Sequence, residues 1–226
     1  MITTSTIQAV IFDLDGVITD TAEHHYLAWK AIADELDIHF TRAFNENLKG
    51  VSRMDSLKLL LSQADTPVQF TDKEMEELAD RKNKLYQSLI ESITPSDILP
   101  GVAEFTAELQ RRGIKTAIAS ASKNAFTVMN SLGLTNAFDI IVDAAKIKNT
   151  KPDPEVFSTA AELLGVEPSH CVGVEDAAAG VQAIKAAGMF AVAIGAKEAF
   201  PQADLVLSST SELDYAKIEG LFIANS

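Results

Sequence analysis

Cysteine and long apolar runs are scarce in this sequence, and each scarcity excludes a class of protein. Cys171 is the only cysteine among 226 residues, so no internal disulfide can form, and its apolar neighbours favour a buried strand residue over a catalytic thiol. No apolar run approaches the ~20 residues that a membrane helix needs. The polar first residues also lack the basic start of a signal peptide. We therefore expect a soluble, cytoplasmic protein.

Basic residues are outnumbered by acidic ones, 19 Lys plus Arg against 32 Asp plus Glu, which gives a formal net charge of −13. This balance argues against a nucleic-acid partner, which needs a basic stripe, and against binding to an anionic membrane. A small anion needs only a local cluster of cations, so a small phosphorylated ligand is compatible with it. The four histidines lack zinc-ligand spacing, and the sequence contains no Gly-rich nucleotide loop and no Ser-His-Asp hydrolase pattern.

Aliphatic side chains must fill most of the core, because hydrophobic residues make up 47% of the chain but aromatic residues only 7%. Short apolar runs predict strands at residues 7–12, 115–119, 139–142, 171–174, 190–194 and 204–207. Helical patterns lie between them at residues 101–112, 124–132, 154–164 and 178–187, and each is followed by a glycine, namely Gly113, Gly133, Gly165 and Gly188. This alternation predicts an α/β fold, with a Rossmann-like parallel sheet and helices on both faces.

Residues 20–93 interrupt the alternation, because they contain several helical patterns and no strand-like run. We interpret this segment as a helical cap inserted after the first strand. The prediction thus divides the chain into a catalytic core and a cap. The core comprises residues 1–18 and 94–226, and the helical cap comprises residues 19–93.

Asp13 and Asp15 follow the first predicted strand, and their two-residue spacing lets both carboxylates face the same side. Two adjacent carboxylates repel unless a cation or a shared proton offsets their charge, and Mg²⁺ prefers oxygen ligands and can bridge to phosphate. Gly16 permits a tight turn beside them. A surface loop with two solvated acids would explain a bare Asp-x-Asp-Gly pattern. The apolar strand before it makes that surface loop much less favoured than a site for Mg²⁺ and a phosphate.

Two other predicted strands also end in residues that suit this chemistry. Glu175 and Asp176 follow one of them, at a place where acids also commonly cap helices. Ser120 follows the other and begins Ser120-Ala121-Ser122-Lys123-Asn124, whose hydroxyls, amides and ammonium suit either a phosphate or a helix cap. The carboxyl ends of parallel strands meet at one edge of a sheet, so these segments should converge on Asp13. That convergence makes metal ligation the better interpretation of the two acids.

Together these motifs resemble those of the haloacid dehalogenase-type phosphotransferases. They are Phe12-Asp13-Leu14-Asp15-Gly16-Val17, Ser120, Lys151-Pro152 and Gly173-Val174-Glu175-Asp176, in the order expected for that family. Four ordered motifs are far more specific than any one of them.

The resemblance implies a role for each of these residues. Asp13 would become an aspartyl phosphate, while Asp15 would act as general acid and base. One Mg²⁺ per active site would be held by Asp13, the backbone carbonyl of Asp15, Glu175 and Asp176. The transferring phosphoryl group would be neutralised by Lys151 and Ser120.

A closer resemblance is to the β-phosphoglucomutase family, and it runs nearly from end to end. It rests on residues 15–25, Trp29, residues 48–53, residues 81–83 and residues 119–124. It implies a sugar pocket lined from the cap side by His25, Lys49, Gly50 and Lys82, with Trp29 and Ala121 as further substrate-binding residues. The phosphate that is not transferred would be held by Arg53, Ser122, Lys123 and Asn124. Ala177 departs from the family, in which Ser often follows the two acids.

This resemblance implies interconversion of β-D-glucose 1-phosphate and β-D-glucose 6-phosphate. β-Glucose 1,6-bisphosphate would be both intermediate and activator, the partner would be a small sugar phosphate, and we expect a monomer. A phosphatase of the same superfamily and a non-catalytic sugar-phosphate sensor are the alternatives. The sensor would have lost an acid, yet Asp13, Asp15 and Asp176 are all present. We also hypothesise that the Lys151–Pro152 bond is cis, since its loop must aim one ammonium.

Overall fold

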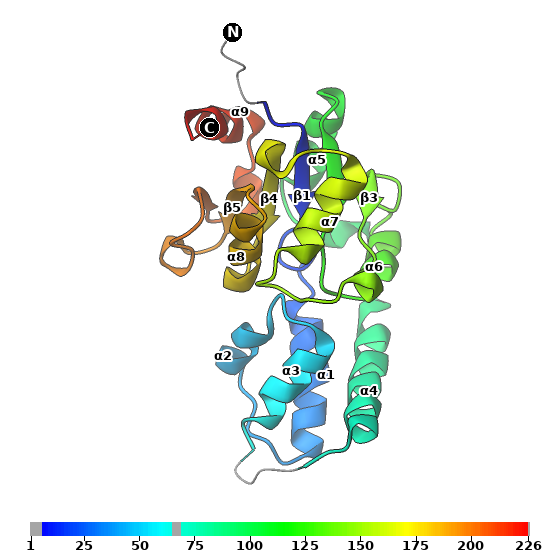
Figure 1. Cartoon of the computed structure of the whole chain (residues 1–226). Coiled ribbons are helices and arrows are strands. Elements are labelled where there is room, and N and C mark those ends of the chain that lie inside the picture. The colour runs from blue at the N-terminus through cyan, green and yellow to red at the C-terminus, as the bar shows by residue number, and fades with distance from the viewer. Residues whose placement is uncertain (1–5, 65–68, 226) are drawn as a thin grey trace.

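The computed structural model describes residues 6–64 and 69–225, in which a parallel sheet flanked by helices stands above a bundle of helices (Figure 1). Residues 1–5, 65–68 and 226, which the predicted core and cap include, lie outside the described part. The strands within it are β1 (Ala9–Phe12), β2 (Lys115–Ile118), β3 (Ile140–Ile141), β4 (Cys171–Glu175), β5 (Phe190–Ile194) and β6 (Leu205–Leu207). Each coincides with a predicted apolar run, which confirms the α/β fold.

The sheet is parallel throughout, with the strand order β3-β2-β1-β4-β5-β6. β1 is central, because Phe12 pairs with Ile118 of β2 on one side and with Val174 of β4 on the other. The chain proceeds from β1 outward to β3 and then restarts at β4 on the opposite side of β1. This change of direction opens a crevice beyond the carboxyl ends of β1 and β4, where open parallel sheets bind their ligands.

Alternation of side chains along β1 divides the core into two layers. Val10 and Phe12 pack among residues of α5 (Val102–Arg111), α6 (Ala125–Ser131) and α9 (Tyr215–Ala224). Ala9 and Ile11 pack among residues of α7 (Glu155–Leu164) and α8 (Ala178–Ala186). The prediction of helices on both faces is therefore confirmed. α9 was not among the predicted helices, because some of its apolar side chains are exposed and its apolar positions do not form a single stripe.

The helical bundle consists of α1 (Ala22–Glu35), α2 (Arg42–Asn45), α3 (Arg53–Leu61) and α4 (Asp72–Ile90), all within the segment predicted as the cap (Figure 1). It has its own apolar core, which includes Trp29, Ile32, Leu57, Leu60 and Leu78. The last turn of α4 is an exception, because Tyr86 and Ile90 are buried with the core of the sheet. Among the described residues, no helix is long and apolar enough to cross a membrane.

The cap joins the core through two adjacent segments of chain. The Leu99 N–H donates to the Ile18 carbonyl at 2.9 Å, and the Thr19 hydroxyl donates to the Asp97 carbonyl at 2.8 Å. Both connections therefore leave the core at one place, close to the end of β1. The cap is thereby held over the crevice at the carboxyl edge of the sheet. The residue limits assigned to core and cap stay a prediction.

Candidate active site

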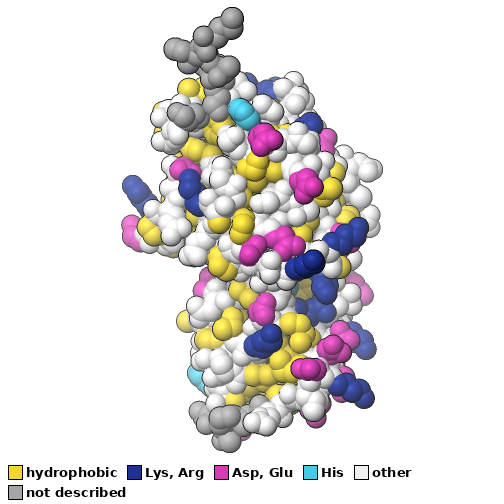
Figure 2. Space-filling model, viewed as in Figure 1, with side chains coloured by type: hydrophobic (Ala, Val, Ile, Leu, Met, Phe, Trp, Pro, Cys, Tyr) yellow, Lys and Arg dark blue, Asp and Glu magenta, His cyan; other side chains and the backbone are white. Residues whose placement is uncertain are grey.

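A cavity of about 620 Å³ lies between the carboxyl edge of the sheet and the helical cap. It is lined by every residue that the sequence nominates for the site except Glu175, which is fully buried. Figure 2 shows Lys and Arg side chains near the level where the two parts meet, in a chain whose net charge is −13. Local cations of this kind make the site compatible with an anionic ligand despite the overall charge.

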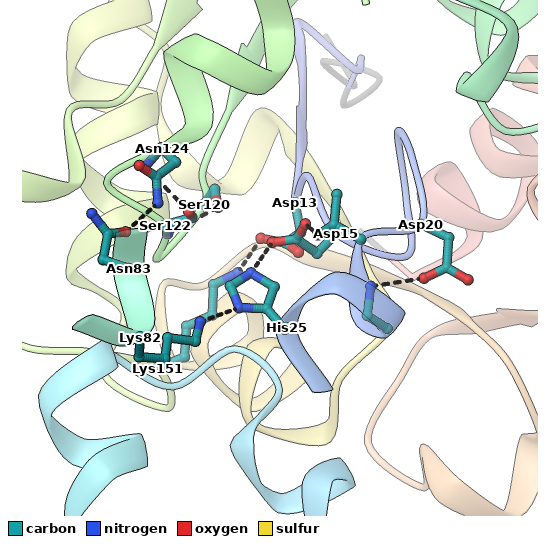
Figure 3. A network of polar contacts seen from close by, with 12 residues as sticks. Asp13, Asp15, Asp20, His25, Lys82, Asn83, Ser120, Ser122, Asn124 and Lys151 are labelled. Carbon is teal, nitrogen blue, oxygen red and sulfur yellow. Dashed lines mark hydrogen bonds and ion pairs between the residues drawn. The ribbon is translucent and has the colours of Figure 1, made fainter. Parts of the chain in front are cut away.

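Asp13 begins where β1 ends, and its backbone N–H donates to the carbonyl of Val174 at 2.9 Å, so the sheet fixes its position. The Lys151 ammonium donates to Asp13 Oδ1 at 2.7 Å (Figure 3). It also donates to Glu175 Oε1 at 2.5 Å. Burial alone would lower the pKa of Lys151, but the two carboxylates outweigh it and raise that pKa. Lys151 is therefore a permanent cation beside Asp13. The Lys151–Pro152 peptide bond is cis, as hypothesised.

Three carboxylates form a cluster that could hold a metal ion. Asp13, Glu175 and Asp176 each offer an oxygen, and these oxygens lie within 4.8 Å of one another. Gly16, at φ +75°, makes room for the Asp176 carboxylate, because a Cβ at residue 16 would lie 2.2 Å from Asp176 Oδ2. An all-oxygen donor set with excess negative charge fits Mg²⁺. The Asp15 carboxylate lies outside this cluster.

The Asp15 carboxylate turns away toward the start of the cap. The Thr21 hydroxyl donates to its Oδ1, and His25 Nε2 lies 3.9 Å from its Oδ2 (Figure 3). Burial, and then the nearby Asp13 carboxylate, raise the pKa of Asp15 to about 7, while the Thr21 hydrogen bond opposes the rise. A carboxyl group with this pKa can both give and take a proton near neutral pH. Thr21 and His25 both lie at the start of α1, where the cap joins the core.

Lys82 of α4 is buried without an acidic hydrogen-bond partner among the described residues. Its ammonium donates to His25 Nδ1 at 2.7 Å and lies 4.9 Å from the ring centre of Trp29 and 4.8 Å from that of Tyr86. Burial, and then the charge of Arg53, lower the pKa of Lys82 to about 7. Because Lys82 occupies Nδ1, the His25 proton is placed on Nε2, which faces Asp15.

The loop after β2 contributes hydroxyl and amide groups. Ser120 is buried, and its hydroxyl accepts from the Ser122 N–H at 3.1 Å. The Ser122 hydroxyl in turn accepts from the Asn124 N–H at 3.2 Å. The Asn124 side chain contacts two residues of α4, Asn83 and Gln87. This loop is therefore folded on itself and joined to the cap helix.

The cap contacts the core on the opposite side of the cavity as well. Lys49 Nζ lies 3.5 Å from Asp176 Oδ2, and the Thr150 hydroxyl donates to Asp55 Oδ2 at 3.3 Å. Gly50, at φ +71°, lies over Lys151, since a Cβ there would be 3.5 Å from Lys151 Cδ. Cap residues thus cover Lys151 and reach Asp176 of the acidic cluster. This arrangement places cap residues between part of the cavity and the solvent.

The sequence profile of the haloacid dehalogenase-like hydrolases matches residues 7–188. The chain belongs to the haloacid dehalogenase-like hydrolase family. Within the family it is similar to the β-phosphoglucomutase of Bacillus subtilis (strain 168), with 48% identity over 206 residues that cover 91% of each chain. A crystal structure of β-phosphoglucomutase from Clostridium difficile is 45% identical, with a TM-score of 0.95 over 97% of this chain and 99% of that one.

The same family also contains phosphatases that resemble this chain less closely. A phosphorylated carbohydrates phosphatase of Thermotoga maritima is 30% identical over 187 residues, which cover 80% of this chain and 82% of that protein. The resemblance to haloacid dehalogenase-type phosphotransferases is confirmed. The similarity to β-phosphoglucomutases is nearly full-length, whereas the phosphatase is distinctly less similar.

In this family member, Lys82 gives a prediction for stability. Its pKa of about 7 in the folded protein lies below the ordinary 10.5, so between these values the unfolded chain binds more protons and folding becomes more favourable as pH rises. Wild type should therefore gain roughly 2 to 3 kcal/mol between about pH 6 and about pH 9 relative to Lys82→Met, at about 1.4 kcal/mol per pKa unit. Urea unfolding at both pH values measures this difference. A stability difference between wild type and Lys82→Met that does not change with pH would show that the Lys82 ammonium is not desolvated.

Sequence reasoning missed several residues of the site. Thr21 and Gln87 received no role, although they contact Asp15 and Asn124. Asp55 and Thr150 were also missed, although they join cap to core. Thr21 could have been suspected as a hydroxyl at the start of the first cap helix. Gln87 could not, because nothing distinguishes it from other exposed polar residues of α4.

Proposed function

We propose that this chain is a magnesium-dependent β-phosphoglucomutase that interconverts β-D-glucose 1-phosphate and β-D-glucose 6-phosphate. The observation that carries the proposal is the position of Asp13, which lies beside Lys151 and an acidic cluster in a cavity closed by the cap. The near-full-length similarity to a β-phosphoglucomutase supports the mutase over the phosphatase. The cap residues Lys49 and Gly50 support it further, because they lie against Asp176 and Lys151, where a closed cap could shield an aspartyl phosphate from water.

In the first half of the cycle, Asp13 carries the phosphoryl group. The 6-hydroxyl of β-glucose 1-phosphate attacks the phosphorus, the bond between phosphorus and the Asp13 oxygen breaks, and Asp15 takes the hydroxyl proton. The products are β-glucose 1,6-bisphosphate and a free Asp13 carboxylate. Lys151 offsets the charge of that carboxylate and of the phosphoryl oxygens. Mg²⁺, when held by Asp13, Glu175 and Asp176, supplies further charge stabilisation to the same oxygens.

In the second half, the bisphosphate rebinds in the opposite sense. Asp13 attacks the phosphorus at C1, the bond between that phosphorus and the C1 oxygen breaks, and Asp15 returns its proton to the C1 oxygen. β-Glucose 6-phosphate leaves, and Asp13 is phosphorylated again. The phosphate that is not transferred lies against Arg53, Ser122, Lys123 and Asn124 in both orientations. A grip on this distal phosphate is what lets either end of the sugar approach Asp13.

An isomerase assay tests the proposal. The protein is given β-glucose 1-phosphate, Mg²⁺ and a trace of β-glucose 1,6-bisphosphate, and glucose 6-phosphate is followed with a coupled dehydrogenase. We expect glucose 6-phosphate at many times the rate of inorganic phosphate, and we expect its formation to stop when EDTA removes the metal. Release of inorganic phosphate without isomerisation would instead make the chain a phosphatase. The expected monomeric state stays a prediction.

A further inference from the structure

The side-chain amide of Asn124 is oriented by two residues of the cap helix α4. Gln87 Nε2 donates to Asn124 Oδ1 at 3.2 Å, and Asn124 Nδ2 donates to Asn83 Oδ1 at 2.8 Å. Figure 3 shows the Asn83 and Asn124 side chains facing each other beside Ser122. Asn124 itself is only 7% exposed, whereas Gln87 lies at the exposed surface of α4.

An asparagine amide has one carbonyl oxygen and two N–H donors. Gln87 uses the oxygen of Asn124 and Asn83 uses one of the two N–H groups, which leaves a second N–H. Asn124 and Asn83 line the cavity, whereas Gln87 lies outside its lining. The amide thus has its oxygen turned to Gln87, and the group that it can still offer to a ligand in the cavity is an N–H donor.

We propose that Gln87 and Asn83 are positioning residues, which hold the Asn124 amide so that an N–H and not the carbonyl oxygen meets the phosphate that is not transferred. This inference rests on the proposed function, since it concerns the distal phosphate of the sugar. The direction of the amide matters because phosphate oxygens only accept hydrogen bonds at neutral pH. An N–H makes a charge-assisted hydrogen bond with them, whereas a carbonyl oxygen repels them.

Gln87 is placed where it can hold this orientation throughout the cycle. It follows Tyr86 and lies one turn before Ile90, and both of these residues are buried with the core of the sheet although α4 belongs to the cap. The last turn of α4 is therefore anchored to the same body as the loop of Asn124. Contacts at Lys49 and Asp55, on the other side of the cavity, lack this anchorage. The Asn124 amide and the turn of α4 that orients it thus belong to one packed body.

Two substitutions of Gln87 separate orientation from simple loss of a hydrogen bond. Gln87→Met removes the donor and leaves the Asn124 amide free to turn. Gln87→Glu presents only acceptors, so it favours the reversed amide, whose N–H groups face Glu and whose oxygen faces the cavity. We expect KM for β-glucose 1-phosphate to rise about 10-fold or more in Gln87→Glu and less in Gln87→Met, with a smaller change in kcat. Ser88→Glu adds the same charge one position along the exposed face of α4 and should leave KM unchanged.

Two further measurements exclude general damage. Phosphorylation of Asp13 by acetyl phosphate, which carries no distal phosphate, should proceed at the wild-type rate in both Gln87 variants. In an Asn124→Ala background, Gln87→Glu should cause no additional rise in KM, because the amide it reverses is gone. Gln87→Glu having no more effect than Gln87→Met or Ser88→Glu would overturn the inference.

Failure of the proposed function would be recognised separately. In that case wild type would give no glucose 6-phosphate in the isomerase assay. Calorimetric titration with glucose 6-phosphate would still rank the variants by their grip on a sugar phosphate. Equal affinities in wild type and Gln87→Glu would refute the positioning role whatever the reaction proves to be.

Discussion

Asp13→Asn is expected to reduce isomerisation by at least about 10⁴-fold, because an uncharged amide cannot form the acyl phosphate on which both half-reactions depend. The substitution keeps the size of the side chain, and the backbone N–H of residue 13 still bonds to Val174, so the fold should be retained. Lys151 keeps Glu175 as its second partner. The coupled assay measures the rate, and intact mass after treatment with acetyl phosphate measures phosphorylation, which should be absent.

Asp20→Asn is the matched control for this substitution. Asp20 is an exposed acid of the same loop, and its Oδ1 accepts from the Ala22 N–H. Its activity should stay within about two-fold of wild type, since exposed substitutions away from the site have small effects. Full mutase activity in Asp13→Asn would refute the covalent mechanism. A wild-type chain that binds sugar phosphate but never becomes phosphorylated would instead support the sensor.

Lys151→Met is expected to damage both activity and stability. The ammonium lies 2.7 Å from Asp13 Oδ1 and 2.5 Å from Glu175 Oε1, and both carboxylates are buried. Its removal leaves two buried acids without their cation, which costs about 3 to 5 kcal/mol of the free energy of unfolding. Loss of charge stabilisation at the phosphoryl group should lower kcat by about 10²- to 10³-fold. Urea unfolding and the coupled assay measure the two effects.

The stability loss in Lys151→Met should depend on pH in a defined direction. Burial already raises the pKa of Glu175 to about 8 in the wild type, and Lys151 opposes that rise, so loss of the cation raises the pKa of Glu175 further. The folded variant then keeps a proton that the unfolded chain has released, so its stability falls as pH rises toward this higher pKa. We expect the difference from wild type to be greater at about pH 9 than at about pH 6, because the variant keeps the Glu175 proton above about pH 8, where the wild type releases it.

Lys185→Met supplies the comparison, because Lys185 forms an ion pair with Asp204 at the surface, at 2.7 Å. A surface pair of this kind contributes no more than about 1 kcal/mol. A similar small loss in Lys151→Met, independent of pH, would show that water reaches the Asp13 carboxylate and that the cation is dispensable to folding.

The fold was predictable because each of its signals is local. A strand can be predicted from a short apolar run such as residues 171–174, and a helix from the pattern that follows it. Parallel pairing of the predicted strands then brings their carboxyl ends together. Asp13, Ser120 and Asp176 meet in the cavity for this reason. α9 escaped prediction because its Leu221 and Ile223 are exposed, so its apolar positions do not form a single stripe.

The orientation of polar groups within the site was not predictable. Lys49 and Asp176 are 127 residues apart in the chain, and Gln87 and Asn124 are 37 apart. Sequence periodicity cannot predict such contacts between distant residues, because these contacts depend on how the cap packs against the core. The desolvation of Lys82 was equally hidden, since a lysine on a predicted helix is most often solvated.

The two connections between cap and core have a consequence for the history of the chain. Ile18 and Leu99 are joined by a hydrogen bond, so the intervening cap begins and ends at neighbouring points. An insertion whose ends already meet adds little closure entropy to the folding of its host, however long it grows. The catalytic strands can thus keep their sequence while the inserted segment is exchanged as a cassette. Selection can change which phosphorylated compound is admitted without rebuilding the machinery that transfers phosphate.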